Sequence, residues 1–431
     1  MDKKTSSLSG FYKKSVAERR GIVQAWANLS EDDLAQLARG GLSDEQANHM
    51  IENVIGVHAL PLAVATNFLI DEIDYLIPLV VEEPSVVAAL SNAGKLFREG
   101  GGFATRSDDP IMIGQIQVLD LQDLPQAVEQ LKAHEASLLA DINAIGGSIV
   151  RAGGGAKALE FRQFEHSVVG PMLVVHILYD TRDAMGANAI NTAAEYIAPR
   201  IEEITGGRVN LRILSNLTDR RKAYASGVVP AELLARDGIS GKDAVRRIVE
   251  AAALAEVDPY RAATHNKGIM NGIDAVILAT GNDWRAVEAG AHAYAARDGV
   301  YRSLTRWWQD DAGNLRGEIE LPLAVGVVGG ATKVHPIAQI ALKILGNPDA
   351  RRLSEIMATV GLAQNFGALR ALALEGIQSG HMRMHAKQLA VAAGATVDQV
   401  EWVTRELVAS GSIRLEKARE LVEHITKRMK A

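Results

Sequence analysis

The order of strand-like and helix-like segments between residues 110 and 219 constrains the fold more than any other feature of this sequence. An alternating apolar and polar run at 113–120 predicts a strand, and the helical pattern that follows it covers 124–145. After a glycine-rich loop at 146–155 come two strand-like runs, a helical pattern and a last strand-like run, at 159–164, 171–179, 184–204 and 209–215. The order β-α-β-β-α-β predicts an antiparallel, ferredoxin-like sheet covered by two helices.

Helical patterns flank this unit on both sides, so we expect it to be inserted into a larger domain. Residues 15–56 carry Ala, Leu and Ile at helical spacing, and Ser30 and Ser43 precede acidic residues as good N-caps. From residue 242 onward the chain is again mostly helical. Glycines between 376 and 380 predict a break between a long helix, at about 352–375, and the C-terminal helices.

The expected fold class is therefore α+β, with three units. A large, mostly helical domain comprises residues 1–109 and 220–377, and the ferredoxin-like domain comprises residues 110–219. The C-terminal helical unit comprises residues 378–431. A chain of 431 residues is long enough for each of roughly three units to have its own core.

Composition excludes several classes of function. The sequence contains no cysteine, which rules out disulfides, cysteine-ligated zinc, iron–sulfur clusters and thiolate catalysis. A net charge of -6 provides no global attraction to phosphate backbones or anionic lipid, so we expect neither a nucleic-acid nor a membrane partner. The charged N-terminal residues lack the apolar core of a secretory signal, and the apolar runs are far short of the ~20 residues of a membrane span. We therefore expect a cytoplasmic protein.

Searches for cofactor and metal motifs are mostly negative. No Gly-x-Gly-x-x-Gly, Walker A or nucleophile-elbow motif fits the sequence, which disfavours a Rossmann domain. His381 and His385 are spaced i, i+4 on one helical face, but no third ligand is evident. We expect no metal site.

A first chemically suggestive segment places two adjacent carboxylates, Glu82 and Glu83, directly after an apolar run. A carboxylate at a strand end that faces a dry pocket has a raised pKa and can carry a proton at neutral pH. A solvated turn explains the same spacing about equally well.

A second segment, at 258–285, crowds Arg, Thr, His, Asn and Lys beside two glycines. Such a cluster can bind a carboxylate through Arg261 and polarise a carbonyl through Lys267. The alternative is a polar loop held by side-chain hydrogen bonds.

A third segment, at 179–191, runs from a strand into a helix. Asp183 suits the N-cap of that helix, and Gly186 lets a ligand approach the first turn, where unpaired N–H groups attract phosphate. This segment therefore suggests dinucleotide binding.

At these three segments the sequence resembles the class II, soluble prokaryotic 3-hydroxy-3-methylglutaryl-CoA reductase family. Seven short segments occur in the family's order and span nearly the whole chain: ENVIG at 52–56, EEPS at 82–85, DAMGAN at 183–188, HNKG at 265–268, GNDW at 281–284, GVVGGAT at 326–332 and GHM at 380–382. The family also has a large substrate domain interrupted by a small ferredoxin-like cofactor domain, with a C-terminal flap. The resemblance therefore agrees with the three units expected above.

The resemblance implies an oxidoreductase that converts 3-hydroxy-3-methylglutaryl-CoA into mevalonate and CoA with two NAD(P)H, or the reverse, through a hemithioacetal and an aldehyde. The implied catalytic residues are Glu83, Lys267, Asp283 and His381. Lys267 would stabilise the oxyanion, Asp283 would hold the ammonium in place and keep it charged, and Glu83 would donate the proton for each carbonyl reduction. His381, on the flap, would protonate the departing CoA thiolate.

The resemblance also implies binding residues and an assembly. Ser85, Arg261, Asn271 and Asn365 would hold the hydroxymethylglutaryl group. Asp183, Met185, Gly186 and Asn188 would line the nicotinamide cofactor site. The segment at 52–56 resembles the family's dimer-interface motif, so we expect a homodimer, or a higher assembly of dimers, with shared active sites.

Cofactor preference stays open between NADH and NADPH. Some NADH-preferring class II enzymes place a carboxylate before the glycine-rich loop, but this chain has none at 143–148, and Arg151 follows. Arg151 can pair with a 2'-phosphate. Two other functions also stay open: a reductase of a different CoA thioester on the same scaffold, and a non-catalytic helical oligomeric binding protein.

Overall fold

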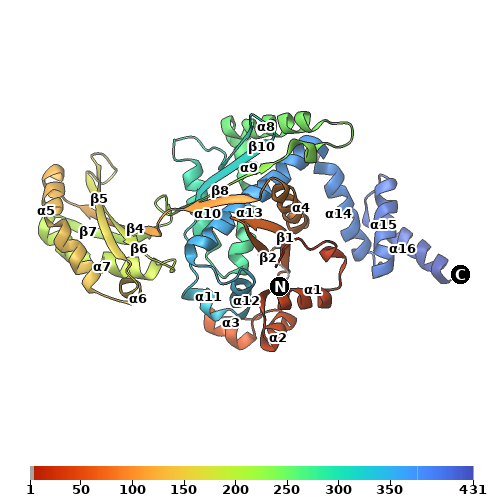
Figure 1. Cartoon of the computed structure of the whole chain (residues 1–431). Coiled ribbons are helices and arrows are strands. Elements are labelled where there is room, and N and C mark those ends of the chain that lie inside the picture. Colours follow the sequence, from red (N-terminus) through yellow and green to blue (C-terminus); the bar gives the residue numbers. More distant parts are fainter. Residues whose placement is uncertain (1–3, 376, 431) are drawn as a thin grey trace.

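The computed structural model describes residues 4–375 and 377–430, without the side chains at 331, 375, 377–384, 397 and 428–430. Figure 1 shows a central body, with the inserted unit on one side and the C-terminal helices on the other. Each of these three parts has its own cluster of buried apolar side chains. No helix among the described residues combines the length and apolar character that a membrane crossing requires.

The inserted unit has the predicted ferredoxin-like order. Its four strands form one antiparallel sheet in the order β5-β6-β4-β7, and its core packs the sheet against α5 and α7. A short helix, α6, follows the first glycines of the loop. The elements are β4 (Ile111–Leu119), α5 (Leu124–Ala144), α6 (Ser148–Arg151), β5 (Gly155–Phe164), β6 (Met172–Asp180), α7 (Ala187–Thr205) and β7 (Arg208–Ser215).

The central body is mostly helical, as expected, but it also contains a six-stranded sheet that the sequence analysis did not identify. The strand order is β2-β1-β3-β8-β10-β9, so strands that precede the inserted unit pair with strands that follow it. The strands are β1 (Leu62–Ile70), β2 (Ile73–Val80), β3 (Phe103–Ser107), β8 (Lys222–Val229), β9 (Thr305–Gln309) and β10 (Leu315–Pro322).

The N-terminal helices confirm the predicted caps. Ser30 Oγ accepts a hydrogen bond from the Asp33 N–H, and Ser43 Oγ accepts one from the Gln46 N–H, each at 3.2 Å, in complete capping boxes. The helices are α1 (Val16–Ala27), α2 (Glu31–Arg39) and α3 (Asp44–Met50). Helices α1 and α2 pack with α12 in a small apolar cluster beside the main core.

Helix α9 lies in the main core and packs closely against α13. A Cβ built at Gly272 would lie 3.0 Å from both Gln364 Cβ and Val360 Cγ1, so a larger side chain there would push α9 and α13 apart. The remaining helices of this body are α4 (Val86–Glu99), α8 (Gly241–Val257), α9 (Pro259–Ala279), α10 (Trp284–Ala295), α11 (Gly330–Val334), α12 (Pro336–Ile344) and α13 (Ala350–Arg370).

The C-terminal helices pack on one another through a separate apolar cluster. Helix α13 continues into a π-helical segment, Ala371–Glu375, and the following helices are α14 (Ile377–Ala392), α15 (Val397–Ala409) and α16 (Leu415–Lys430). Gly380 lies inside α14, so within the described residues the predicted break at 376–380 does not extend to this glycine. The glycine at 376 lies outside the described residues.

Candidate active site

The polar segment around Lys267 forms α9 rather than the alternative polar loop. Asp258 caps this helix by accepting a hydrogen bond from the Tyr260 N–H at 3.1 Å, and Pro259 occupies the first helical position. Lys267 and Asn271 are four residues apart and therefore lie on one face of α9. The helix fixes the spacing of the polar groups that the sequence placed together.

Glu83 meets that face of α9 just after the end of β2. Lys267 Nζ donates a hydrogen bond to Glu83 Oε2 at 2.8 Å, and Asn271 Nδ2 donates to the same oxygen at 3.4 Å. Packing of α9 against β2 brings the two segments together. Two of the three chemically suggestive segments therefore converge on one ion pair.

This ion pair is open to solvent in the single chain. The Lys267 side chain is 62% exposed and the Glu83 side chain is 37% exposed. Of the two alternatives for this segment, the exposed pair favours the solvated one over the dry pocket within the described part of the chain.

Asp283 does not form the expected ion pair with Lys267. Its Oδ1 caps α10 by accepting hydrogen bonds from the Arg285 and Ala286 N–H groups at 3.1 and 3.2 Å, and the Arg285 guanidinium lies 3.2 Å away. Within the described part of the chain, the carboxylate on Lys267 is that of Glu83. The N–H groups of α10 and the Arg285 guanidinium hold the Asp283 carboxylate in place. Lys267 pairs with Glu83 instead.

Arg261 is a half-buried cation one and a half turns before Lys267 on α9. Burial lowers the pKa of its guanidinium. No ion pair with a carboxylate is recorded for it within residues 4–375 and 377–430, so it is suited to bind an acidic ligand group. Ser85 immediately precedes α4 and has a left-handed backbone (φ 81°), a strained conformation that costs about 1–3 kcal/mol and is typical of functional sites.

Asn365 lies on α13, and its side chain is buried. Its Oδ1 accepts hydrogen bonds from Thr305 Oγ1 at 2.9 Å and from Trp307 Nε1 at 2.8 Å. His265 Nε2 lies 2.7 Å from the same Thr305 hydroxyl. Burial, assisted by the charge of Arg261, lowers the pKa of His265 to about 3, so this histidine stays neutral and orients Thr305. Sequence reasoning missed Thr305 and Trp307, which no motif marks.

The DAMGAN segment at 183–188 forms the turn before α7. Gly186 is the N-cap with φ 93°, and a Cβ there would lie 2.2 Å from Thr181 Cγ2, so only glycine fits. Met185 is half-buried and Asn188 is exposed on the first turn. The unpaired N–H groups of this turn are suited to bind phosphate, as predicted for a dinucleotide site.

Asp183 does not cap α7, contrary to the prediction. Its Oδ1 accepts a hydrogen bond from the Ala350 N–H at 3.0 Å, at the beginning of α13, and its main-chain carbonyl accepts one from the Val327 N–H at 2.9 Å. The turn is folded so that Asp183 reaches the central body, which leaves the cap position to Gly186. Asp183 therefore joins the inserted unit to the central body.

Arg221 strengthens the same junction, and sequence reasoning missed it. Its guanidinium is buried and donates to Thr181 Oγ1 at 2.9 Å, to the Ala184 carbonyl at 3.1 Å and to the Val325 carbonyl. Burial lowers the pKa of Arg221 to about 10. One buried cation thus connects the DAMGAN turn with the segment that precedes GVVGGAT at 326–332.

The glycine-rich loop lies against the DAMGAN turn. Arg182 Nη2 donates to the Gly153 carbonyl at 2.6 Å, and Lys157 Nζ donates to the same carbonyl at 3.1 Å. Arg151 is exposed on α6, at the beginning of this loop. Three cations therefore surround a loop that adjoins the N-terminus of α7, and this charge suits a phosphorylated cofactor.

His381 belongs to α14, but its side chain lies outside the described residues. His385, one turn later, is exposed. Among the side chains that the structure describes, no group of three or more His, Asp and Glu residues is arranged to hold a metal ion.

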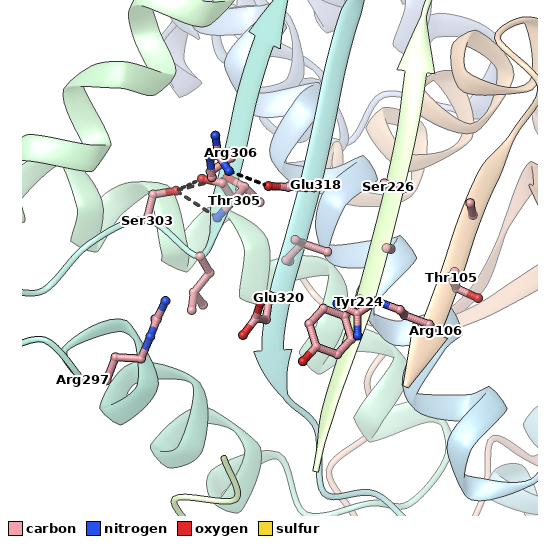
Figure 2. Close-up of a pocket in the computed structure, with 14 residues that line it drawn as sticks. Thr105, Arg106, Tyr224, Ser226, Arg297, Ser303, Thr305, Arg306, Glu318 and Glu320 are labelled. Atoms are coloured by element: carbon pink, nitrogen blue, oxygen red, sulfur yellow. Dashed lines mark hydrogen bonds and ion pairs between the residues drawn. The ribbon is translucent and has the colours of Figure 1, made fainter. Parts of the chain in front are cut away.

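A cavity of about 430 Å³ lies on the outer face of the six-stranded sheet (Figure 2). Its charged groups largely satisfy one another: Arg306 pairs with Glu318 at 3.1 Å, and the Arg106 guanidinium stacks 3.3 Å from the centre of the Tyr224 ring. None of the predicted site residues lines it. The candidate active site is therefore the surface at Glu83, Lys267 and Asn271 rather than this cavity.

Comparison with known sequences identifies related enzymes over nearly the whole chain. Residues 15–386 match the family model described as hydroxymethylglutaryl-coenzyme A reductase. The chain is 51% identical over 421 residues to 3-hydroxy-3-methylglutaryl-coenzyme A reductase of Archaeoglobus fulgidus, covering 98% of this chain and 95% of that protein. It is 34% identical to a probable reductase of the same name from Borreliella burgdorferi, covering 88% of this chain and 85% of that protein.

Solved structures of such a reductase share the fold. The enzyme from Streptococcus pneumoniae superposes with a TM-score of 0.83 at 41% identity, covering 97% of this chain and 100% of that chain. A class II structure from the same organism, bound to NADPH in open conformations, gives a TM-score of 0.81 at 41% identity and covers 96% of this chain and 100% of that chain.

Proposed function

The chain belongs to the hydroxymethylglutaryl-coenzyme A reductase family, and we propose that it interconverts 3-hydroxy-3-methylglutaryl-CoA and mevalonate with two molecules of NAD(P)H. The observation that carries this proposal is the ion pair between Lys267 and Glu83, with Asn271 on the same carboxylate oxygen. A cation, a carboxyl group that can carry a proton and an amide are suited to the reduction of a carbonyl.

In the proposed mechanism, Lys267 binds the carbonyl oxygen of the thioester and stabilises the negative charge that develops there. Glu83 lies 2.8 Å from the same ammonium, and after it takes up a proton from solvent it would be placed to deliver that proton to the carbonyl oxygen. Asp283 lies at the beginning of α10 and would approach Lys267 only after release from Arg285. His381 is proposed to protonate the CoA thiolate that leaves.

Substrate binding is proposed to use the cation and amides around this pair. Arg261 has no recorded carboxylate partner in the part of the chain that the structure describes, and it would hold the carboxylate of the hydroxymethylglutaryl group. Asn271 and Ser85 flank Glu83 and would orient the substrate hydroxyl and carbonyl. Asn365 would act from the buried network with Thr305.

The nicotinamide cofactor is proposed to bind the inserted unit, between the glycine-rich loop and the first turn of α7. When bound, NAD(P)H supplies the hydride for each reduction. Met185, Gly186 and Asn188 form the turn that would contact the cofactor, and Arg151 and Arg182 would meet its phosphates. A structural relative is bound to NADPH, which supports a cofactor of this class.

We also propose that the active form is a homodimer. The ENVIG segment at 52–56 exposes large apolar side chains: Ile55 has a relative exposure of 104%, and Ile51 and Val57 are exposed beside it. Burial of such side chains against a second copy would release apolar surface from water. A second subunit would also supply a cover for the exposed pair of Lys267 and Glu83.

The test is an assay of the purified protein with 3-hydroxy-3-methylglutaryl-CoA and each nicotinamide cofactor in turn. We expect about two NAD(P)H to be oxidised per CoA released, as two hydride transfers require. Since the protein has no cysteine, a thiol reagent reports free CoA without a protein background. Oxidation of NAD(P)H by a different CoA thioester but not by this one would reject the proposed substrate.

A further inference from the structure

A second polar network lies on the same face of α9 as the candidate active site. Asp274 lies three residues after Asn271 and seven after Lys267, so the three side chains share one face of the helix. The Asp274 carboxyl is half-buried and forms a hydrogen bond with the Glu288 carboxyl on α10. This contact joins the two helices that carry Lys267 and Asp283.

A hydrogen bond between two carboxyl groups requires a proton on one of them, because an ionised carboxylate only accepts. Asp274 Oδ1 is buried and receives no hydrogen bond from any donor in the described residues. Burial, and then the charge of Glu288, raises the pKa of Asp274 to about 8. A hydrogen bond from His292, whose Nε2 lies 2.5 Å from Glu288 Oε2, lowers the pKa of Glu288. Asp274 therefore holds the proton and donates to Glu288.

The network continues from Glu288 back to α9. His292 Nδ1 lies 2.7 Å from the Tyr301 hydroxyl, which donates to it when the imidazole is neutral. The Asn266 side chain in turn bonds Tyr301, and its Nδ2 donates to the Arg302 carbonyl at 2.8 Å. Asn266 is the residue immediately before Lys267. The chain of hydrogen bonds thus begins and ends on α9, on either side of the lysine.

We propose that Asp274 is a positioning residue: its protonated carboxyl donates to Glu288 and so holds α9, which carries Lys267, against α10, which begins at Asp283. This inference rests on the function proposed above. The proposed mechanism needs Lys267 and Asp283 to approach each other. The contact between Asp274 and Glu288 fixes α9 against α10, and Asp274 lies between Lys267 and Asp283 in the sequence. A displacement of even 1 Å at such a site is expected to lower turnover strongly.

Glu288 is the charged group that acts on Asp274, and His292 and Tyr301 follow it in the network. Several charged side chains on the other elements packed against α9 have ion-pair partners of their own: Lys343 of α12 pairs with Asp33 of α2, Arg352 of α13 with Glu355, Arg98 of α4 with Asp74 of β2, and Asp243 of α8 with Arg246. On α10 itself, Asp283 pairs with Arg285. Ionisation of Asp274 therefore places its negative charge beside that of Glu288, whose other side contacts the His292 ring.

Loss of this proton is expected to loosen the contact between α9 and α10 and to lower turnover at alkaline pH. One pH unit above a pKa near 8, about a tenth of the molecules keep the proton, so kcat is expected to fall about tenfold from its neutral value. Asp274→Asn retains a donor toward Glu288 and cannot ionise. The variant is expected to keep kcat near neutrality within about threefold and to fall less than twofold over the same alkaline range.

The experiment compares the pH dependence of kcat for wild type and Asp274→Asn, with Asp258→Asn at the beginning of the same helix as the matched control. In Asp258→Asn the side-chain oxygen can still accept the hydrogen bond from the Tyr260 N–H that caps α9, so kcat should decrease at alkaline pH as in wild type. Identical alkaline limbs in wild type and Asp274→Asn overturn the proposal. Glu288→Gln provides a second variant if Asp274→Asn does not fold. Glu288→Gln removes the negative charge that faces Asp274, so the alkaline decrease of kcat should become smaller. An alkaline decrease equal to that of wild type in this variant also overturns the proposal.

A measurement without substrate separates this inference from the proposed function. Between the ordinary pKa of 3.8 and about 8, Asp274 keeps its proton in the folded protein and loses it in the unfolded chain. The folding equilibrium constant of wild type is therefore expected to decrease as pH rises toward about 8, by up to about tenfold per pH unit. Urea titrations should show this trend in wild type and not in Asp274→Asn. Equal pH trends in the two proteins overturn the inference, whatever the substrate proves to be. If stability depends on pH as expected but 3-hydroxy-3-methylglutaryl-CoA is not turned over, the proposed function is rejected and the inference about Asp274 is retained.

Discussion

Lys267 and Glu83, which are 184 residues apart in the chain, form an ion pair of 2.8 Å at the surface where α9 meets the end of β2. A pair this exposed contributes little to stability, about 0–1 kcal/mol. The pair matters for chemistry because the Lys267 ammonium lies next to the Glu83 carboxyl and is also open to a substrate carbonyl oxygen. The first prediction therefore concerns this lysine.

Lys267→Met is expected to lower kcat by about 10²–10³ while the protein stays folded, since it removes the group that stabilises the developing oxyanion. The measurement is steady-state turnover together with the urea midpoint. Lys132→Met on α5 is a matched control, because Lys132 is similarly exposed and pairs with Glu129 at 2.9 Å. Wild-type turnover in Lys267→Met would contradict the role assigned to the lysine.

A second prediction concerns the acid stability of the buried network at His265. Its folded-state pKa, about 3, lies below the ordinary value of 6.5, so between these values the unfolded chain binds a proton that the folded chain does not. The free energy of unfolding is therefore expected to fall as pH falls through this range, by up to about 1.4 kcal/mol per unit.

His265→Gln tests this dependence, because its amide N–H still donates to Thr305 but cannot be protonated at these pH values. The urea midpoint of His265→Gln, measured from pH 6.5 downward, should fall less steeply than that of wild type. His134→Gln, at an exposed position on α5, should follow the wild-type curve. If all three proteins lose stability equally, His265 is not the group responsible.

The inserted unit was predictable because each of its elements has a clear local pattern. Alternation marks β4, helical spacing marks α5 and α7, and glycines separate them. The sheet of the central body was not predictable in this way. Strands β1 and β2 are nearly continuous apolar runs, which periodicity alone does not distinguish from a buried helix, and β3 and β9 have only five residues each.

The site was predictable as a set of residues but not as a set of contacts. Motifs selected Glu83, Lys267 and Asp283, yet only the packing of α9 against β2 determines that Glu83 is the partner of Lys267. The roles of Asp183 at α13 and of Asp274 at Glu288 depend equally on elements that are distant in sequence. Local propensity contains no information about such pairings, because tertiary packing decides them.

A third prediction addresses cofactor choice through Arg151. This exposed arginine lies on α6, in the loop that Arg182 and Lys157 hold. Arg151→Glu is expected to lower kcat/KM with NADPH at least about tenfold, because a carboxylate repels the 2'-phosphate, and to leave kcat/KM with NADH within about threefold. Arg208→Glu, on the opposite edge strand β7, is the matched control and should change neither value. An equal decrease of kcat/KM with NADPH and with NADH would show that Arg151 does not contact the 2'-phosphate.

The last prediction concerns the ENVIG segment at 52–56 as the proposed dimer interface. Ile55 is fully exposed in the single chain, so Ile55→Glu should not disturb the fold of one subunit, but it would place a charge in the interface. We expect the variant to sediment as a monomer and to lose turnover, because Lys267 and Glu83 remain open to water without the partner. Val168→Glu, at an equally exposed apolar position in the loop between β5 and β6, should remain dimeric and active. An Ile55→Glu protein that stays dimeric, or a wild-type protein that is monomeric and fully active, would show that this segment does not join subunits and that the ion pair works without a second chain.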